Sequence, residues 1–380
     1  MRMKSLYSPR FVLLAVAVLT VVLFPGFASG KEKEPRAVTI MTQNLYLGTD
    51  LAPVLGATTV PALIGAATVG FANVQATNFP ERAVALAGEV EAAMPALIAL
   101  QEVSLFRIRS ASDPSPATTV AIDYLQLLLD ALAARGLQYG VVAEVKNFDS
   151  EIPAFLPGIT GLGFVRLTDR DVILARTDLK LDQLSLSNVQ SSNFAANLTV
   201  TAAGVPLTLL RGWASVDVTV KGKTFRFLTT HLEPFSPPIQ VAQANELLAG
   251  PGDTFLPLVF AGDFNTNAEA PPGADTPTYG NLIAAGFVDA WSQIDPLDPG
   301  YTCCEAANLL NASPTLNTRI DLVLMRDGIG RRHRSIVADA ADVVGEEPND
   351  KTPSGLWPSD HAGVVVKFHL GGPGEDPECD

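Results

Sequence analysis

The chain has 380 residues, of which 47% are hydrophobic, and its formal net charge is −14. This composition supports a sizeable core within one large domain and excludes wholesale disorder. The acidic balance disfavours a protein that holds nucleic acid through a broad basic surface, although a bound metal in a nuclease can invert the field locally.

The first thirty residues have the features of a secretory signal peptide. Arg2, Lys4 and Arg10 precede the apolar run FVLLAVAVLTVVLF, which is short for a membrane span, and small residues follow at 28–30. We therefore predict a signal peptide over residues 1–30 and export to the periplasm or the extracellular space. A single N-terminal anchor is the alternative interpretation. Loss of the three positive charges on cleavage takes the net charge from −14 to −17.

Helical and strand-like patterns alternate through the first half of the mature chain. Short or alternating apolar runs predict strands, and apolar residues at helical spacing predict helices. In chain order we predict a strand at 37–47, a helix at 80–94, a strand at 96–103, a helix at 119–136, and strands at 139–146, 164–176 and 194–210.

The second half begins with a run that predicts two strands joined near Lys221 and Gly222, a hairpin over 213–232. Helices fall between groups of hairpin-connected strands, which favours an α/β (α+β) fold of two packed mixed sheets with helices outside. We place this fold in one domain over residues 31–370. The remaining predicted elements are a helix at 239–250, a strand at 257–265, a helix at 278–286, and strands at 319–326 and 361–370.

Two insertions interrupt the regular pattern. Residues 48–78 are rich in Gly, Ala, Thr and Val, and residues 292–318 are rich in Pro, Asp and Asn. Neither has the pattern of core, so each either shapes a binding mouth or is a surface elaboration. The polar, Pro- and Gly-rich residues 371–380 predict a flexible tail.

The three cysteines do not have the spacing of a zinc site. Cys303 and Cys304 are adjacent, and Cys379 lies in the tail. A vicinal bond and a bond from Cys379 to one of the pair are both open. The oligomeric state is open as well.

Polar side chains recur where the predicted strands begin or end. Taken singly, each has an ordinary explanation as a solvated strand end, a turn former or a structural histidine. Taken together, they supply carboxylates for a hard cation, donors for phosphate oxygens, and an acid and a base for attack by water. The set comprises Asn44, Glu102, His231, Asp263, Asn265, Asp321, Asp360 and His361.

The ordered segments QN, LQEV, TTHLE, GDFN, RIDLVL and SDH resemble the endonuclease/exonuclease/phosphatase superfamily, the DNase I-like proteins, in a secreted bacterial-type form. The resemblance spans residues 37–370, and the ordered set of six is far more specific than any one segment. It implies a four-layer sandwich of two β-sheets flanked by helices, in agreement with the patterns above.

The resemblance also implies a metal centre with a base. Glu102 would be the main ligand of Mg²⁺ or Mn²⁺, with Asn44 beside it and Asp360 near the metal. His361 would act as a general base toward water, oriented by Asp321.

The remaining matches imply contacts to the substrate. His231 would donate to the phosphate or to the leaving oxygen, and Asp263 and Asn265 would position the phosphate and the nucleophile. Asp171, in DRDVILAR, would be an acidic partner of His231, although the first aspartate of the same DRD is an alternative match. Arg211, in LRGWASV, is a possible phosphate contact.

These matches predict a secreted, divalent-metal-dependent phosphoesterase, and more specifically a phosphodiesterase acting on nucleic acid or a related diester. Inositol phosphatases carry a WTDR-like segment where this chain has NTRIDLVL, which disfavours that branch of the family. Apurinic endonucleases rely on basic surface, which disfavours them for a chain of this acidic charge. A sphingomyelinase- or phospholipase C-like lipid phosphodiesterase is the alternative, although the insertion at 48–78 lacks the aromatic anchors usual at a lipid interface. A catalytically inactive binding protein on the same fold is the third possibility. The natural substrate is left open.

Overall fold

The computed structural model describes residues 37–329 and 335–371, and its strands form two large sheets and one small hairpin. The strands of the first sheet are β1 (Ala37–Asn44), β2 (Leu97–Gln101), β3 (Leu105–Ser110), β4 (Thr119–Asp123), β5 (Tyr139–Ala154), β6 (Gly163–Arg176), β15 (Ile336–Val344) and β16 (Gly363–Leu370). The strands of the second sheet are β7 (Ser185–Asn193), β10 (Gly212–Val220), β11 (Lys223–His231), β12 (Leu258–Asp263), β13 (Val288–Asp289) and β14 (Asp321–Arg326). The hairpin consists of β8 (Leu198–Ala202) and β9 (Val205–Leu209).

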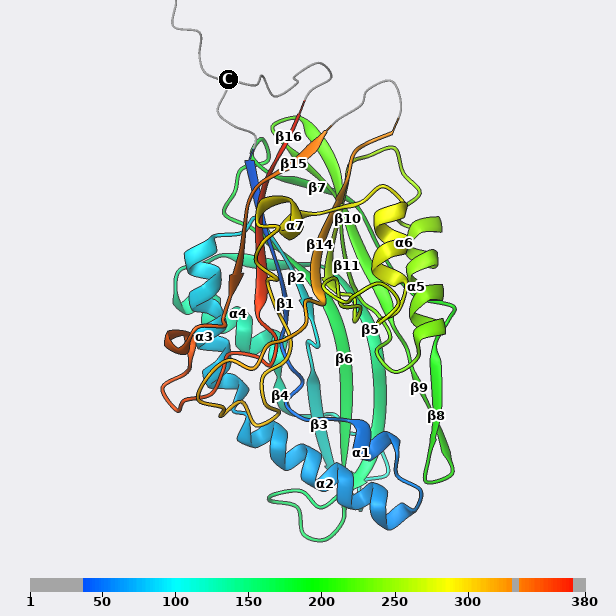
Figure 1. Cartoon of the computed structure of the whole chain (residues 1–380). Coiled ribbons are helices and arrows are strands. Elements are labelled where there is room, and N and C mark those ends of the chain that lie inside the picture. The colour runs from blue at the N-terminus through cyan, green and yellow to red at the C-terminus, as the bar shows by residue number, and fades with distance from the viewer. Residues whose placement is uncertain (1–36, 330–334, 372–380) are drawn as a thin grey trace, which may run out of the picture. The chain divides into compact units, whose positions relative to one another are not determined.

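Helices lie between these strands in the chain (Figure 1). They are α1 (Ala52–Leu55), α2 (Val60–Ala76), α3 (Phe79–Ala93), α4 (Tyr124–Ala134), α5 (Pro237–Ala249), α6 (Thr278–Ala284), α7 (Ala290–Ile294) and the 3-10 helix η1 (Pro348–Asp350). In the described chain no single helix is long and apolar enough to cross a membrane; α2 and α3 reach that length only together, as a pair bent by 49°.

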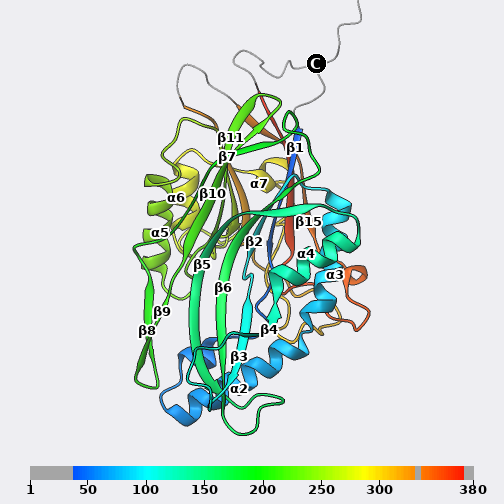
Figure 2. The same cartoon turned by 180° about the vertical axis from the view of Figure 1, so that it is seen from behind.

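Both large sheets are mixed. The first runs in the order β15-β16-β1-β2-β6-β3-β4, with β5 paired to β6, and the second in the order β13-β14-β12-β11-β10-β7. The pairs β1–β2 and β11–β12 are parallel, and their neighbours in each sheet are antiparallel. The long β5 and β6 lie side by side across the back of the molecule in Figure 2.

The central strands β2 and β12 are apolar over most of their length because they are buried on both faces. Side chains alternate between faces along a strand, so neighbouring apolar residues enter different cores. In β12, Val259 packs in the core between the two sheets, whereas Phe260 packs in the core beneath α5 and α6. In β2, Ala99 packs between the sheets and Leu100 packs against α3 and α4.

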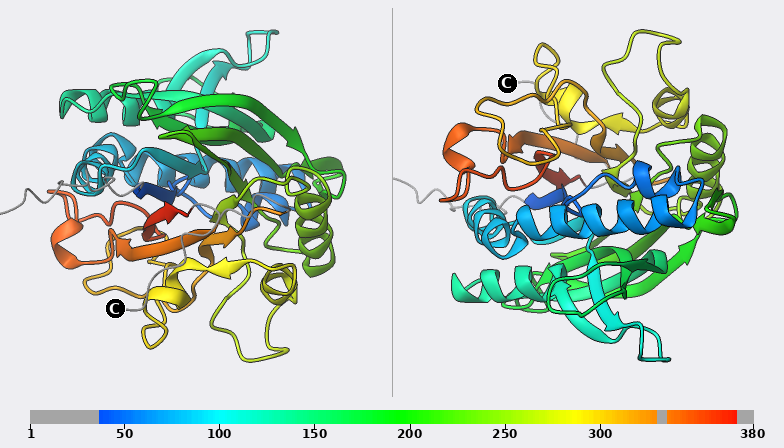
Figure 3. Two further views of the ribbon diagram at one scale, coloured as in Figure 1. Left: turned by 90° about the horizontal axis from the view of Figure 1, so that it is seen from above. Right: turned by 90° about the horizontal axis from the view of Figure 1, so that it is seen from below.

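Four layers result from this packing. The helices α2, α3 and α4 cover the outer face of the first sheet, and α5 and α6 cover the outer face of the second (Figure 3). The predicted sandwich of two mixed sheets flanked by helices is therefore confirmed. The hairpin predicted within 213–232 is also confirmed, and its turn residues Lys221 and Gly222 have positive φ angles of 47° and 80°.

Several predicted elements are wrong in detail. The helix expected at 119–136 begins only at Tyr124, because the preceding residues form β4 and pair with β3. The Asp123 carboxylate accepts a hydrogen bond of 3.2 Å from the Leu125 N–H and so caps α4 at that point. The single strand expected at 194–210 is instead the β8–β9 hairpin, and β3, β7 and β15 were not predicted.

The insertion at 48–78 contributes to the core, contrary to the sequence-based expectation. Leu63, Ala67, Phe71 and Val74 of α2 are buried at a spacing of one helical stripe. The many small residues on this helix dilute the contrast between its two faces, which hides the stripe in the sequence. The second insertion also reaches the interior, where Leu309 packs in a small buried cluster.

Three expectations concern residues outside the described chain in whole or in part. The signal peptide at 1–30 lies outside it, as does the tail beyond Gly371. Cys303 and Cys304 are joined as a vicinal disulfide, and Cys379 is not among the described residues.

Candidate active centre

The predicted site residues meet where the strands of the two sheets end. His231, Asp263 and Asp321 are direct register partners across β11, β12 and β14. In the first sheet, Asn44 ends β1 opposite the last residue of β2, and Glu102 follows it. The pairing of adjacent strands, rather than nearness in sequence, therefore brings these groups together.

The GDFN turn places its acid by backbone geometry. A side chain at Gly262 would put its Cβ 2.1 Å from the Thr230 carbonyl oxygen, so only glycine allows β12 to approach β11 so closely here. Asn265 has a φ of 49°, and its N–H donates to Asp263 Oδ1 at 2.9 Å. Its side-chain Nδ2 donates to the Leu232 carbonyl at 3.0 Å and thereby fixes the turn to β11. A contact of Asn265 with the nucleophile stays a prediction.

Asn44 joins the two sheets at the centre. Its Nδ2 donates to Glu102 Oε1 at 3.3 Å and to Asp263 Oδ2 at 3.1 Å, and its Oδ1 accepts from the Tyr46 N–H at 2.9 Å. Glu102 itself has a φ of 55°, and its Oε2 accepts from the Leu47 N–H at 2.6 Å. In this geometry Asn44 positions Glu102 against Asp263, and its predicted contact with a metal is not tested.

His361 and Asp321 form a close pair although 40 positions separate them. His361 Nδ1 lies 2.8 Å from Asp321 Oδ2, and both residues are buried. The backbone of His361 is held as well, since its N–H donates to Ser359 Oγ at 3.2 Å and its carbonyl accepts from Gln43 Nε2 at 3.1 Å. On the other side of the ring, Nε2 lies 3.9 Å from Asp360 Oδ1.

The centre concentrates acids around one imidazole. Burial, and then the charge of Asp321, raises the pKa of Asp263 to about 7. Burial also raises the pKa of Asp360 to about 7, with a further contribution from Glu102 that opposes the effect of His361. Burial alone would lower the pKa of His361, but Asp321 and Asp360 together raise it well above its ordinary value.

These donors fit a hard divalent cation. One oxygen of Asp263, one of Asp321 and a ring nitrogen of His361 lie within 4.8 Å of one another. Asp321 Oδ1 and Asp360 Oδ1 are inaccessible and have no hydrogen-bond partner within the described ranges. Oxygen-rich sites with uncompensated negative charge suit Mg²⁺ and similar ions.

His231 has a different environment from His361. Its Nε2 lies 3.4 Å from Asp263 Oδ2, and its Nδ1 is buried without a partner in the described part of the chain. Burial, and then the charge of Arg211, lowers the pKa of His231 well below its ordinary value. Among the described residues Asp171 makes no hydrogen bond with His231, and the carboxylate that approaches the ring belongs to Asp263, so the predicted pairing with Asp171 stays a prediction.

Asp171 and Arg211 border the centre from β6 and the start of β10. Burial, and then the charge of Asp169, raises the pKa of Asp171 well above its ordinary value, while Arg211 opposes this. Sequence reasoning set Asp169 aside as an alternative and missed Asn147, which lies at a bulge of β5 beside Asp171. The bulge gives no clear signal in the sequence, because the flanking residues alternate as in a regular strand.

Sequence reasoning also missed Arg82, which braces the loops around the centre. This fully buried side chain on α3 donates from Nη1 to the carbonyls of Leu45 at 2.7 Å and Pro358 at 2.9 Å. Its Nη2 donates to the Tyr46 carbonyl at 3.0 Å. A signal was available, since Arg82 follows Phe79 by one helical turn on the apolar stripe of α3.

Comparison with known proteins identifies relatives of this fold. A model of the endonuclease/exonuclease/phosphatase family matches residues 41–361. No curated protein matches the sequence. Among solved structures, an endonuclease/exonuclease/phosphatase family protein from Bacteroides thetaiotaomicron is similar, with 16% identity and a TM-score of 0.51 over 90% of this chain and 100% of that chain.

Two further solved structures show how varied these relatives are. A mannosyl-6-phosphatase from Bacteroides thetaiotaomicron has 16% identity and a TM-score of 0.50 over 87% of this chain and 99% of that chain. TDP2 from D. rerio, complexed with a single-strand DNA product, has 16% identity and a TM-score of 0.51 over 88% and 99% of the two chains. At such identities the likeness shows the fold alone.

Proposed function

The chain belongs to the endonuclease/exonuclease/phosphatase family, and on this premise we propose that it is a secreted, Mg²⁺- or Mn²⁺-dependent phosphodiesterase. The observation that carries the proposal is the buried His361–Asp321 pair, with 2.8 Å between Nδ1 and Oδ2, beside the acid of the GDFN turn. The pair places an oriented imidazole next to groups suited to phosphate and metal. The natural substrate is a nucleic acid or a related diester.

His361 takes the proton of the attacking water in this proposal, once a bound cation offsets the negative charges of Asp321 and Asp360 that otherwise raise its pKa. With Nδ1 held by Asp321, Nε2 is the nitrogen left to act on a water or a phosphate oxygen. The neighbouring Asp360, 3.9 Å from Nε2, limits the positions that the ring can adopt. Asp321 therefore acts through His361, as the group that fixes its tautomer and orientation.

The chain holds the cation mainly through Glu102. Glu102 is partly exposed, whereas its neighbour Asn44 is fully buried and fixes its orientation by the 3.3 Å bond. When bound, the cation supplies charge for the phosphate oxygens and polarises the phosphorus centre. The raised pKa of Asp263 and that of Asp360 support this, since uncompensated negative charge is what a cation relieves.

Two cationic or neutral donors are free to receive a phosphate oxygen. The Nε of Arg211 and the Nδ1 of His231 are buried and have no hydrogen-bond partner among the described residues. The charged guanidinium of Arg211 binds phosphate strongly, whereas His231, whose pKa is lowered well below its ordinary value, would donate as a neutral imidazole. For Nδ1 of the neutral ring to donate, Nε2 has to accept a hydrogen bond, which the protonated carboxyl group of Asp263, 3.4 Å away, would supply.

Export is part of the proposal and rests on the sequence. Basic residues, an apolar run and small residues precede Lys31 in the order of a signal peptide. Sequencing of the N-terminus of the exported protein should find a start near Lys31. A product that retains Met1 and stays in the cytoplasm would exclude export.

A groove favours a lipid phosphodiesterase as the second candidate. A cavity of about 280 Å³ lies between α2 and the loop 307–310, and Tyr46 lines it next to the active centre. Val69 and Leu310 are exposed apolar side chains in its wall. Apolar lining beside a phosphate site suits a substrate with an apolar substituent.

A substrate panel separates the candidates. Plasmid DNA, RNA, sphingomyelin, bis-p-nitrophenyl phosphate and p-nitrophenyl phosphate are each incubated with the protein, with and without chelator. The proposal expects metal-dependent cleavage of diesters and slow cleavage of the monoester. Cleavage of sphingomyelin in preference to nucleic acid would favour the second candidate, and no cleavage of any ester with metal present would contradict both.

A further inference from the structure

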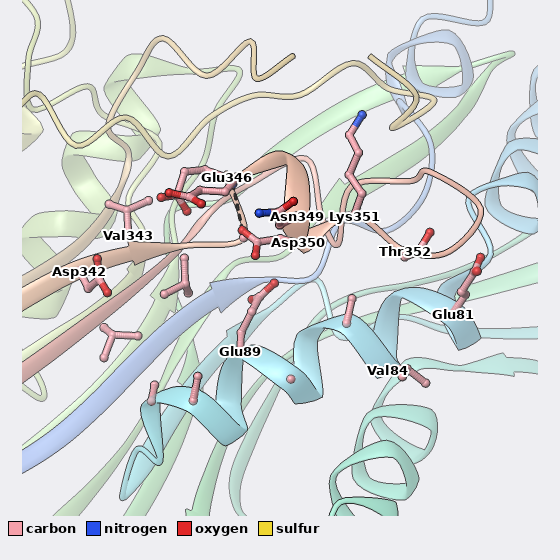
Figure 4. Close-up of a pocket in the computed structure, with 18 of the residues that line it drawn as sticks. Glu81, Val84, Glu89, Asp342, Val343, Glu346, Asn349, Asp350, Lys351 and Thr352 are labelled. Carbon is pink, nitrogen blue, oxygen red and sulfur yellow. Dashed lines mark hydrogen bonds between the residues drawn. The ribbon is translucent and has the colours of Figure 1, made fainter. Parts of the chain in front are cut away.

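A second acidic region lies away from the active centre, on the outer side of α3 (Figure 4). It is a pocket of about 800 Å³ between α3 and the segment that connects β15 to β16. Acidic side chains dominate its polar lining. They are Glu81, Glu89, Asp342, Glu346, Glu347 and Asp350.

Glu89 is the most unusual of these acids. Both of its carboxylate oxygens are inaccessible to solvent, and neither has a hydrogen-bond partner in the described chain. The backbone closes over it, since a Cβ at Gly345 would lie 3.0 Å from Glu89 Oε1. In Figure 4 the Glu89 carboxylate points from α3 toward Asp350. The Oε2 atom of Glu346 is likewise buried and unpartnered among the residues described.

The acids repel one another in this pocket. Burial, and then the charges of Asp350 and Glu346, raises the pKa of Glu89 to about 8. Burial raises the pKa of Glu346 to about 7, and Asp350 and Asp342 add to the effect. A buried charged carboxylate without donors or a counter-charge destabilises the fold. A proton or a cation bound at this point would relieve that cost.

The two basic residues that line the pocket are engaged elsewhere. Arg135 Nη1 lies 2.5 Å from Glu91 Oε2, on the exposed side of α3. Lys351 donates to the Asn311 carbonyl and lies 4.5 Å from the centre of the Trp357 ring. Figure 4 shows the Lys351 amine directed away from the acids, so neither cation neutralises Glu89.

We propose that this pocket binds a divalent cation, with Ca²⁺ preferred, through Glu89, Glu346 and Asp350. Carboxylate oxygens from α3 and from the β15–β16 connection face the same space, and Asn349 adds a neutral oxygen from the same lining. Calcium accepts six to eight oxygen ligands in flexible geometry, including waters, which suits a partly open pocket better than the strict octahedron of Mg²⁺.

Binding requires the side chains to move. Two sets of described residues bring three ligand atoms within 4.8 Å of one another, and both contain His361 of the active centre. The carboxylates on α3 and the β15–β16 connection do not meet that distance in the cation-free geometry, as mutual repulsion predicts. The ion draws them together by rotation of the Glu346 side chain, while Asp350, whose Oδ2 accepts from the Glu347 N–H at 2.9 Å, offers its Oδ1.

The site would tie a functional segment to the fold. The β15–β16 connection continues through Pro358, whose carbonyl is held by Arg82 on the same helix, to Asp360 and His361. Arg82 fixes the end of this segment nearest the active centre, and the ion would fix its start near Glu346. A cation at this place therefore stabilises the protein without touching the substrate.

Calcium titration of the full mature chain tests the proposal. Excess Mg²⁺ keeps the active centre out of the measurement, and both calorimetric binding and the melting temperature are recorded. The wild-type protein should bind one additional Ca²⁺ with a Kd of about 10⁻⁴ to 10⁻³ M and melt at a higher temperature with it. Glu89→Gln and Glu346→Gln should each weaken binding by roughly tenfold or more.

Glu91→Gln is the matched control, because Glu91 lies on the same helix and does not line the pocket. Its partner Arg135 does line the pocket, so Arg135→Met is measured beside it. Glu91→Gln should bind Ca²⁺ as the wild type does. If Glu89→Gln fails to fold, Glu346→Gln decides alone. Absence of an additional Ca²⁺ in the wild type, or wild-type affinity in both glutamine variants, would overturn the proposal and leave a pocket of protonated acids.

Discussion

The active centre and the pocket on α3 both gather carboxylates, but they differ in whether the acid at their middle has hydrogen-bond donors. In the active centre, Asn44 donates to Glu102 and Asp263, and Asp321 pairs with His361 at 2.8 Å. In the pocket, the Glu89 oxygens have no donor among the described residues. The first arrangement holds Glu102 and Asp263 in place before any ligand arrives, whereas the second leaves Glu89 to a proton or an ion.

Helix α3 connects the two regions. Its N-terminal part carries Arg82, whose guanidinium is satisfied by main-chain carbonyls around the centre, and Glu89 follows two turns later. One helix thus carries a buried cation whose hydrogen bonds are satisfied and a carboxyl group whose oxygens have no donor in the described chain and whose pKa is raised to about 8. Variants in the active centre test what hydrogen bonding contributes to turnover, and variants of Arg82 and Glu89 on α3 test what it contributes to stability.

The largest expected effect concerns the hydrogen-bonded pair of His361 and Asp321. General-base help contributes roughly 10²- to 10⁴-fold, so His361→Ala should lower turnover of bis-p-nitrophenyl phosphate by about that factor. Asp321→Asn should lose a large share of the same factor, because the ring loses its 2.8 Å partner. The double variant should be little worse than His361→Ala, since both changes disable one unit.

Melting temperature is the control for this series. A purely structural hydrogen bond would lower the melting temperature of the variants and leave turnover per folded molecule near normal. Multiplicative losses in the double variant would show that the two residues act separately. Unchanged turnover in His361→Ala would remove it from the mechanism.

The second expected effect is a loss of stability when Arg82, near the N-terminus of α3, loses its hydrogen bonds. Arg82→Met keeps much of the side-chain length but leaves the carbonyls of Leu45, Tyr46 and Pro358 without their donor. Hydrogen bonds from a charged group contribute about 1.5–3 kcal/mol each, so the free energy of unfolding should fall by at least about 3 kcal/mol. Denaturant unfolding measures this difference.

Arg135→Met is the matched control for Arg82→Met. Arg135 pairs with Glu91 at the surface, with 33% and 48% of the two side chains exposed. Exposed pairs contribute about 0–1 kcal/mol, so this variant should unfold nearly like the wild type. Equal decreases in the free energy of unfolding of the two variants would show that the hydrogen bonds of Arg82 to buried carbonyls stabilise the fold no more than a surface ion pair does.

The smallest expected effect is the pH dependence of stability caused by Glu89, whose carboxyl oxygens have no hydrogen-bond donor in the described chain. The pKa of Glu89 is raised from an ordinary value of 4.5 to about 8, so between these values the folded state keeps a proton that the unfolded state has lost. Stability in chelator should therefore fall as pH rises through this window. Glu89→Gln should flatten the fall and melt roughly 2 °C or more above the wild type at pH 8.

A melting curve recorded from pH 5 to pH 8 in chelator tests this sign. Glu91→Gln should follow the wild type, because Glu91 lies outside the pocket. A Glu89→Gln variant that is less stable than the wild type at pH 8 would show that the charged carboxylate has a favourable partner after all.

The residues that the sequence predicted for the site lie together in the fold because each acid stands at a strand end within a recognisable segment. Asp263 in GDFN and Asp321 in RIDLVL are placed by strand register, and the strands themselves are strongly apolar. Pairing of β12 with β11 and with β14 then brings the two aspartates beside His231, although nothing in the sequence around each residue indicates this contact. Their roles in catalysis stay predictions.

The pocket on α3 could not be predicted in the same way. Glu89 lies among several glutamates of an ordinary amphipathic helix, and its partners follow β15, a strand that the pattern did not reveal. The alternating alanines and aspartates of β15 give a weak signal, since only Ile336 and Ala338 are buried. Burial of Glu89 depends on how the β15–β16 connection packs on α3, which no local pattern encodes.

Turnover of bis-p-nitrophenyl phosphate during a Mg²⁺ titration tests the central claim of metal-assisted diester hydrolysis most directly. The wild-type protein and Glu102→Gln are each stripped of metal and titrated. We predict no turnover without metal, recovery of the wild type with Mg²⁺ or Mn²⁺, and a far higher metal requirement in Glu102→Gln, because the main ligand has lost its charge. Full wild-type turnover in excess chelator, or the same metal requirement in both proteins, would contradict the claim.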